Sequence, residues 1–345
     1  MVTIRQVANQ AGVSIGTVSR VLNHKPGVSD ETREHVSGVA REMGYSVPYR
    51  APVSPANISR LGLLNPPIHG GLLTNPFYHD VFLGVEQVCQ EQQIKLSFNT
   101  LDMSDISRAH LRSHPPLLKD ENLNGLVLVG AMQYQVVSDL IDACPMPVVL
   151  VDNHFAESPW DSIMIDNKRG MEHIIRHLVT QGHCHIALLS GPEHPSIIER
   201  RNSYEQTMRA YGLTPLIASP PDLMPDSAEQ CVLQLLEQSP ELTAFACSND
   251  LQAIAVSKKL QELNYAVPAD FSVTGFDDIS LTEYASPPIT TIRVDRIALG
   301  RLAVEILLSR IKYPQKPPLC VVIGINFCER ASVGPARPVL AQAAA

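Results

Sequence analysis

The stretch VANQAGVSIGTVSRVLN, residues 7–23, predicts two short helices joined by a tight turn. Apolar residues recur at helical spacing on both sides of Gly12, which supplies the turn. Ala8 is small where the two helices would cross, and Val18 and Val21 would pack inward. This pattern is typical of a helix-turn-helix, whose second helix lies in the major groove of DNA.

The residues around this stretch complete a three-helix domain with one small core. Helix caps and stop signals predict three helices: one opened by a capping box at Thr3 and ending before Gly12, one over about 15–22 capped by Ser14, and one over 30–43 capped by Ser29.

The second of these helices carries side chains suited to DNA. Ile15 can touch a thymine methyl group, Gly16 leaves room for a close approach, and Arg20 can donate two hydrogen bonds to guanine. Hydroxyl groups that can bond phosphates lie on or beside the same helix, at Ser14, Thr17 and Ser19.

The composition is that of an ordinary globular protein, with 345 residues, 45% apolar and 18% charged. This length favours two or three domains. No apolar run reaches the ~18 residues of a membrane span, and the N-terminus lacks the profile of a secretory signal, so we expect a cytoplasmic protein. Seven cysteines without a C-x-x-C pair favour reduced thiols over disulfides or a zinc ribbon.

The net charge of −8 is divided unevenly along the chain. Residues 1–50 contain six Lys or Arg and four Asp or Glu and carry +2, which leaves −10 for the rest. A mildly basic head on an acidic body confines any contact with DNA phosphates to the head.

A proline-rich segment separates this head from a long second region. Residues 46–60 include Pro48, Pro52 and Pro55, which disfavour helix and predict an extended linker. Beyond it, apolar strands alternate with helix-length stretches, which indicates doubly wound parallel sheets buried on both faces. The eight expected strands fit two α/β subdomains better than one: RLGLLN, IKLSFN, GLVLVG, PVVLVD, HIALLSG, TAFACSN, FSVTGFDD and CVVIGINF.

Several motifs, in order along residues 1–333, resemble those of the lactose/galactose repressor (LacI/GalR) family. They are TIRQVANQAGVSIGTVSRVLNHKPGVSDETREHV, NPFYHDVFLGVEQV, PVVLVDN, IDNKRGMEHIIRHLVTQGH, ERRNSYEQTMRAYGL, SNDLQAIAV and VTGFDDISLTEYASPPITTI. The resemblance implies a bacterial transcription regulator, a repressor, that binds double-stranded operator DNA of near-palindromic sequence as a homodimer. It also implies a periplasmic-binding-protein-like core that senses a small-molecule effector.

The resemblance implies domain boundaries as well. We expect a helix-turn-helix headpiece at 1–45, a linker at 46–60, an effector-binding core at 61–333 and a tail at 334–345. The chain should cross between two lobes near Trp160, Thr290 and Val321. The lobes are then discontinuous, and their expected extents are 61–160 with 291–320, and 161–290 with 321–333.

The functional positions of the family carry over by motif. Ile15, Gly16 and Arg20 correspond to base-reading positions. The implied phosphate contacts are Thr3, Ser14, Thr17, Ser19, Asn23, Ser29 and Thr32. The implied effector pocket lies between the lobes, at the carboxyl ends of parallel strands, where α/β folds bind ligands. Its implied residues are Asn65, Phe77, Tyr78, Arg200, Asn249 and Asp277.

These side chains suit a ligand with hydroxyl groups and a flat face. We expect a sugar or sugar derivative, and the alternative is a nucleoside, a purine or another small polar molecule. A hexose is less favoured because Leu223 and Met224 stand where relatives often present an aromatic platform. Three other acidic residues we interpret as helix caps, namely Asp166, Asp250 and Asp278.

The linker departs from the family pattern. Members usually carry a short hinge helix of the form P-N-x-x-A-R-x-L, but here Pro52 and Pro55 fall inside that pattern. We therefore expect no ordinary hinge helix. Either Tyr49 or Pro55 wedges into the minor groove instead, or the headpieces are loosely tethered. In the second case the chain binds DNA weakly and acts mainly as a ligand-binding module.

Other chemistry finds little support in the sequence. His173 and His177 share a helix face near His183, Cys184 and His185, but no H-E-x-x-H pattern is present, and we expect no metal site. No nucleophile elbow, phosphate loop or dinucleotide motif appears, so we expect neither an enzyme nor a cofactor.

One expected helix carries an apolar stripe that bears on whether the chain forms a dimer. Val81, Phe82, Val85 and Val88 fit core packing, and by resemblance this helix also lines a dimer interface. The C-terminal segment is too short and irregular for a tetramerising heptad.

Overall fold

The structure of the chain is a computed structural model. It describes residues 4–22, 28–43, 58–66, 72–73, 75–101, 116–156 and 158–338. The chain divides into two compact units, Met1–Pro52 and Val53–Ala345, a division that falls inside the expected linker. The predicted behaviour of the hinge at Tyr49, Pro52 and Pro55 lies outside the described residues. Of the helices described, none is long and apolar enough to cross a membrane.

The described elements of the headpiece are all helices, and in the core strands alternate with helices, as expected. The helices are α1 (Ile4–Ala11), α2 (Ile15–Leu22), α3 (Asp30–Glu42), α4 (Pro76–Glu91), η2 (Pro116–Lys119), α6 (Tyr134–Ala143), α7 (Asn167–Thr180), α8 (Pro195–Ala210), α9 (Pro225–Gln238), α10 (Asp250–Glu262), α11 (Leu281–Tyr284) and α12 (Arg296–Lys312). The strands are β1 (Arg60–Asn65), β2 (Lys95–Thr100), β3 (Leu126–Val129), β4 (Val148–Val151), β5 (Asp161–Ile165), β6 (Ile186–Leu189), β7 (Leu216–Ala218), β8 (Ala244–Cys247), β9 (Ser272–Thr274), β10 (Thr291–Val294), β11 (Cys320–Ile323) and β12 (Ile325–Cys328).

The headpiece is the predicted three-helix domain. Gly12 has a φ of 65° between α1 and α2, a left-handed conformation that favours glycine. Two of the three predicted caps form, since Ser14 Oγ accepts from Thr17 N at 3.0 Å and Ser29 Oγ accepts from Thr32 N at 3.3 Å, while the predicted capping box at Thr3 lies outside the described residues. The three helices bury one apolar core, made of Val7, Ala8, Ala11, Val18, Val21, Val36 and Ala40.

The first sheet of the core is parallel throughout, in the order β11-β5-β4-β3-β1-β2. Alternate side chains of its strands pack on opposite faces. Val127 and Val129 belong to a cluster with α4 and α12, whereas Leu126 and Leu128 belong to a cluster with α6. Because both faces are covered, these strands are continuously apolar in the sequence. We call this sheet with α4, α6 and α12 the first lobe.

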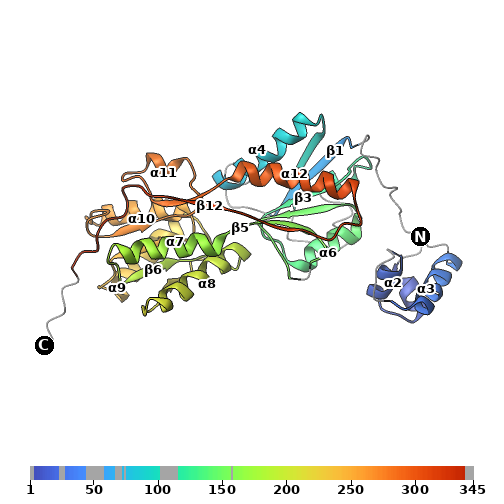
Figure 1. Cartoon of the computed structure of the whole chain (residues 1–345), viewed down its shortest axis with the longest axis horizontal. Coiled ribbons are helices and arrows are strands. Elements are labelled where there is room, and N and C mark those ends of the chain that lie inside the picture. Colours follow the sequence, from blue (N-terminus) through green and yellow to red (C-terminus); the bar gives the residue numbers. More distant parts are fainter. Residues whose placement is uncertain are drawn as a thin grey trace. The chain divides into compact units, whose positions relative to one another are not determined.

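The second sheet is also parallel, in the order β7-β6-β8-β9. Ile186 and Leu188 face α7 and α8, whereas Ala187 and Leu189 face α9 and α10. We call this sheet with α7–α11 the second lobe. Figure 1 shows the two lobes, with β12 running between them.

The lobe boundaries differ from those expected. Asp161–Ile165 pairs with β4 and β11, so these residues belong to the first lobe rather than to the second. Cys320–Ile323 also lies in the first sheet, and the chain crosses after Ile165 and again beyond Ile323. The antiparallel pair β10 and β12 forms the remaining connection. The boundary near residue 160 was carried over by resemblance, and it was wrong because Asp161–Ile165 adds a further strand to the first sheet before the chain crosses.

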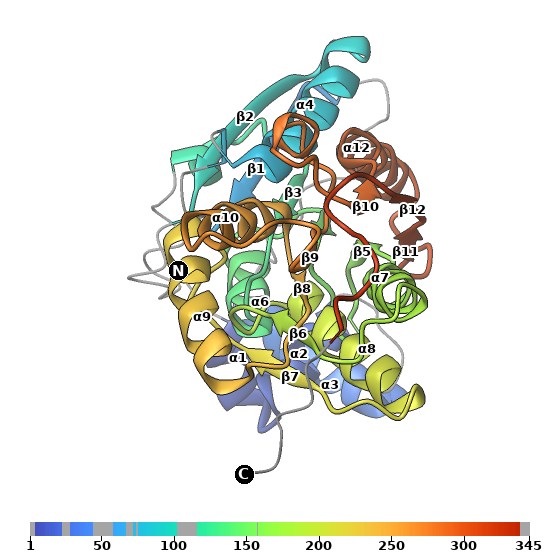
Figure 2. The same ribbon diagram turned by 90° about the vertical axis from the view of Figure 1, so that its left-hand side faces the viewer.

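Two helices of the first lobe pack unusually closely, α4 and α12 (Figures 1 and 2). A Cβ on Gly84 would lie 2.1 Å from the carbonyl oxygen of Ile297, and one on Gly300 would lie 2.0 Å from that of Val81. Two glycines therefore set the distance between these helices.

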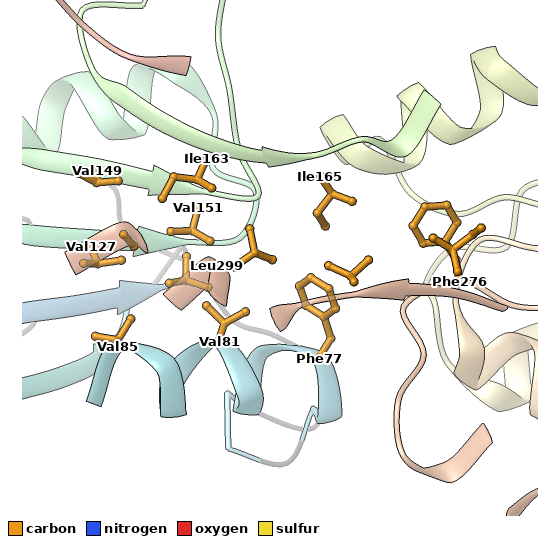
Figure 3. Close-up of a cluster of buried hydrophobic side chains, with 14 of the residues drawn as sticks. Phe77, Val81, Val85, Val127, Val149, Val151, Ile163, Ile165, Phe276 and Leu299 are labelled. Atoms are coloured by element: carbon orange, nitrogen blue, oxygen red, sulfur yellow. The ribbon is translucent and has the colours of Figure 1, made fainter. Parts of the chain in front are cut away.

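The apolar stripe of α4 is mostly core. Figure 3 shows Val81 and Val85 facing the first sheet, and both side chains are fully buried, while Val88 is nearly so. Phe82 is half-buried and lies against the exposed Phe98, with ring centroids 5.1 Å apart. Of the predicted stripe, only Phe82 is left for contact with a partner subunit.

Candidate functional site

A pocket lies between the two lobes, where strands of both sheets end. Its empty space, with the open mouth included, is about 540 Å³. The first lobe supplies Phe77 and Tyr78 at the start of α4. The second lobe supplies Arg200, Asn249 and Asp277. Five of the six predicted effector residues are therefore brought together in one pocket.

Arg200 is the central cation of the pocket and is only 4% exposed. Its Nε donates to Asn167 Oδ1 at 2.8 Å, and its Nη1 donates to the carbonyl oxygen of Ser248 at 2.5 Å. Its Nη2 donates to Asp277 Oδ1 at 3.2 Å. The guanidinium carbon stands 3.6 Å from the centroid of the Phe276 ring. This network holds one edge of Arg200 rigidly against Asp277, and rigid polar groups give a ligand a fixed orientation.

Asp277 follows β9 in a backbone conformation with φ at 109°, which is rare for a residue with a side chain. Burial raises the pKa of Asp277 to about 6, although the charges of Arg200 and Arg296 lower it. At neutral pH its carboxylate is mostly ionised, so it accepts hydrogen bonds.

Three helices begin at the pocket, but their N-termini are already capped. Asn75 Oδ1 accepts from Phe77 N at 3.1 Å, and Asn249 Oδ1 accepts from Gln252 N at 2.9 Å. His194 Nδ1 accepts from Ser196 N at 3.2 Å. In addition, α4 and α8 each begin with a proline, which has no N–H. Free backbone donors, which would bind an anion, are therefore scarce here.

A second polar group in the pocket escaped the sequence analysis. Asp152, which follows β4 in the first lobe, accepts from Ser196 Oγ of the second lobe and from Tyr78 Oη at 3.0 Å. His194 Nε2 lies 3.5 Å from Asp152 Oδ2. Burial lowers the pKa of His194, and the Asp152 charge opposes this effect. The backbone of Asp152 has a φ of 57°, which the sequence does not indicate. In the sequence, the only sign of a site at Asp152 was its position as a polar residue at the end of the apolar run PVVLVD.

One predicted residue, Asn65, lies outside the pocket, and another, Asn249, has a second role. Asn65 ends β1 as predicted, but it does not line the pocket, and its Nδ2 donates to the carbonyl oxygen of Pro66 at 2.7 Å. Asn249 lines the pocket and also caps α10, and its Nδ2 donates to the carbonyl oxygen of Leu223 at 3.4 Å. Leu223 itself lines the pocket at the position without an aromatic ring.

Of the three aspartates interpreted as helix caps, only Asp166 is one, with its side chain accepting from Arg169 N. Asp250 is the first residue of α10 rather than its cap, and it accepts from Ile279 N at 2.8 Å and Thr291 Oγ1 at 2.5 Å. Burial raises the pKa of Asp250 well above its usual range. Asp278 instead pairs with Arg293 and Arg330. Asp250 is therefore engaged by neutral donors and Asp278 by two arginines, and neither side chain caps a helix.

The histidines on and near α7 contact other side chains of the fold. His183 is buried, with Nδ1 2.9 Å from Thr243 Oγ1 and Nε2 2.9 Å from Ser272 Oγ. His177 packs against the Phe327 ring at 4.9 Å. Among the side chains that the structure describes, no three His, Cys, Asp or Glu gather as metal ligands would.

The headpiece presents the second candidate site, on α2. Gly16 and Arg20 are exposed, and Ile15 is half-buried against the headpiece core. The hydroxyls of Ser14 and Thr17 lie 2.9 Å apart at the start of α2, and those of Ser29 and Thr32 lie 2.8 Å apart at the start of α3. These hydroxyl groups can donate to phosphate oxygens. The positions of Thr3 and Asn23, and the side chain of Ser19, lie outside what the structure describes.

Two family models match the chain. Residues 3–48 match "Bacterial regulatory proteins, lacI family", and residues 175–333 match "Periplasmic binding protein-like domain". The ribose operon repressor of Haemophilus influenzae is 32% identical, over 93% of this chain and 98% of the relative. The transcriptional repressor PurR of Aliivibrio salmonicida is also 32% identical, over 90% of this chain and 93% of the relative.

Solved structures agree with these relatives. A complex of the transcriptional regulator CelR with cellobiose has a TM-score of 0.74 at 27% identity, and the match covers 96% of this chain and all of that one. The lac repressor dimer bound to operator has a TM-score of 0.71 at 25% identity, with 96% and 99% of the two chains covered. With a helix-turn-helix headpiece, a two-lobed α/β core and these relatives, the chain belongs to the lacI family of bacterial transcription regulators.

Proposed function

We propose that the chain is a repressor whose headpiece binds an operator and whose interlobe pocket binds a small uncharged effector. The observation that carries this proposal is the pocket itself. Groups of both lobes line it, so a ligand that contacts both changes the free energy of one lobe arrangement relative to another. Asp277, Arg200 and Asn249 would bind the ligand's polar groups, and Phe77 and Tyr78 its apolar face.

A sugar is the effector class that we favour. The pocket combines carboxylate and amide oxygens with aromatic edges, as a polyhydroxylated ligand requires. A ribose operon repressor is among the relatives, and solved relatives contain ribose or cellobiose. A purine is the second candidate, because the Phe77 and Tyr78 rings offer apolar surface and repressors named PurR are equally similar.

Isothermal titration of the full-length protein with D-ribose, cellobiose, hypoxanthine and guanosine tests the pocket. We expect one of these compounds to bind to the wild type and to lose its affinity in the Asp277→Asn variant. Equal binding to both proteins would place the ligand elsewhere, and no binding by any compound would contradict both proposed classes.

Phosphorylation of the effector is expected to weaken binding by about tenfold or more, a loss of at least ~1.4 kcal/mol. A phosphate here would meet the acidic side chains of Asp152 and Asp277, and the helix N-termini at the pocket are already capped. Paired titrations with D-ribose and D-ribose 5-phosphate make the comparison. Tighter binding of the phosphate would show that the pocket is electropositive in solution.

On the DNA side, we propose that Ile15, Gly16 and Arg20 read bases and that Ser14, Thr17, Ser19, Thr3, Asn23, Ser29 and Thr32 hold phosphates. An Arg20→Ala substitution is expected to relax base preference at one position per half-site, at a cost of about 1–3 kcal/mol. Selection from a randomised DNA pool measures this preference, with Glu34→Ala on α3 as the control. An unchanged preference would mean that Arg20 binds a phosphate.

We also propose that the regulator acts without catalysis, as a homodimer in the cytoplasm, where it reaches the nucleoid. Phe82 and the exposed Phe98 on the first lobe support a contact with a second copy. Sedimentation of wild type and a Phe98→Glu variant tests this assembly, and a dimer that persists unchanged in the variant would rule out this face.

A further inference from the structure

Arg296, the first residue of α12, is not among the residues that line the pocket. Its side chain is only 12% exposed, and its guanidinium reaches two different elements. Nε and Nη2 contact Asp80 Oδ2 on α4, at 3.0 and 2.8 Å. Nη1 donates to the backbone carbonyl oxygen of Asp277. One planar group therefore joins a helix of the first lobe to the peptide of a pocket residue in the second lobe.

Both ends of this connection matter for the pocket. Asp80 lies on the same face of α4 as Phe77, one turn later. By pairing with Asp80, Arg296 therefore holds the start of α4, whose Phe77 and Tyr78 form the aromatic wall of the pocket. At the other end, Asp277 has its rare backbone conformation, with φ at 109°. Such a conformation persists only where surrounding contacts hold it.

Few other contacts hold the Asp277 peptide. Asp277 N donates to the carbonyl oxygen of Ile292 at 2.8 Å, and the bond from Val294 N to the Asp277 carbonyl is long, at 3.4 Å. The charge-assisted bond from Arg296 is stronger than that neutral one. The Asp277 side chain is held separately, by Arg200.

We propose that Arg296 is a positioning residue for effector binding, which fixes the Asp277 carboxylate relative to the aromatic wall of α4 without touching the ligand. This inference rests on the proposed effector role of the pocket. It assigns the connection between α4 and Asp277 to one side chain, and a lysine could not replace it because a single ammonium lacks the planar fork that spans both partners.

The chain supplies a matched control. Arg301, one and a half turns further along α12, also pairs with α4, through Glu91 at 2.8 and 3.0 Å. This pair is exposed and reaches neither Asp277 nor the pocket. If Arg296 only fastened α12 to α4, its loss would resemble the loss of Arg301.

Hydrogen–deuterium exchange of the full-length protein without ligand tests the positioning directly. We expect Arg296→Gln to speed exchange of the amides in 275–280 about tenfold, the factor for one lost charge-assisted hydrogen bond. Arg301→Gln should leave that segment unchanged. Asp80→Asn keeps the charge of Arg296 and should give a smaller increase in exchange, both in 275–280 and in 77–82. This variant replaces Arg296→Gln in the test if Arg296→Gln does not fold. Equal protection of 275–280 in all four proteins would overturn the proposal.

Isothermal titration gives a second measurement, made with whichever of ribose, cellobiose, hypoxanthine and guanosine binds to the wild type. Its Kd is expected to rise about tenfold in Arg296→Gln and in Arg296→Lys but less than about twofold in Arg301→Gln. An unchanged Kd in Arg296→Gln would overturn the positioning role. Failure of all four compounds with wild type would count against the proposed function, and the exchange data would still decide the role of Arg296.

Discussion

An Asp277→Asn substitution is expected to abolish the response of operator affinity to the effector and to leave operator binding without effector unchanged. The Asp277 carboxylate has one oxygen bonded to Arg200 and faces the pocket. An amide at this position loses the negative charge and turns one acceptor into a donor, so ligand hydroxyls meet a mismatched partner in a buried site. We expect effector affinity to fall at least about 100-fold, the equivalent of ~2.7 kcal/mol.

The variant should still fold. The amide oxygen of asparagine can accept from Arg200 Nη2, and Arg200 keeps its bonds to Asn167 and Ser248. The headpiece, a separate unit, is not altered. Titration of effector and measurement of operator binding in the same preparation check both halves of this prediction. If operator binding were lost together with the effector response, the effect would come from misfolding.

The pH dependence of effector binding follows from the same residue. Because burial raises the pKa of Asp277 to about 6, its carboxylate is mostly protonated at pH 5. Protonation removes the negative charge and turns one oxygen into a donor, so wild-type affinity is expected to fall about tenfold between pH 7 and pH 5. In Asp277→Asn the residual affinity should not change over this range. A flat wild-type profile would mean that the ligand binds the neutral acid equally well.

A Gly84→Ala substitution is expected to destabilise the core by about 3 kcal/mol or more, which lowers Tm by roughly 5 °C or more. The new Cβ would lie 2.1 Å from the Ile297 carbonyl oxygen and 3.0 Å from Arg301 N, and both are backbone atoms of α12 that cannot move aside alone. The whole helix must shift, and α12 buries Leu299, Ala303 and Val304 in the core.

Thermal unfolding followed by circular dichroism measures this cost. Gly38→Ala is the control, since it makes the same change inside helix α3, where nothing lies within 4 Å. That variant should be neutral or slightly more stable, because alanine favours helix by about 1 kcal/mol over glycine. Equal melting of Gly84→Ala and wild type would contradict the close packing of α4 and α12.

The sequence was most informative where local chemistry decides structure. Gly12, Ser14 and Ser29 act through turns and caps within a few residues, so the three headpiece helices could be predicted. Continuous apolar runs likewise predicted β1, β3, β4, β6 and β8. One apolar run was misinterpreted, because CVVIGINF is two strands in different sheets, separated at Gly324.

Features that depend on distant partners could not be predicted in this way. The strand β5 begins with a buried charge, Asp161, which Arg310 pairs with at 2.7 and 2.8 Å, and a sequence pattern gives no sign of that partner. The contact of Asp152 with Ser196 joins two lobes across 44 residues. Asn65 lies at a strand end, as predicted, but its side chain donates to the carbonyl oxygen of the next residue, Pro66, and does not line the pocket.

The most direct test of the regulator account is sequencing of bacterial genomic DNA fragments retained by the purified full-length protein at low and moderate salt. The account predicts strong enrichment of a palindromic site, retention that falls steeply with salt, and no enrichment by a variant that lacks residues 1–52. Absence of any enriched site at low salt, or equal enrichment by the truncated variant, would contradict the claim that this headpiece reads an operator.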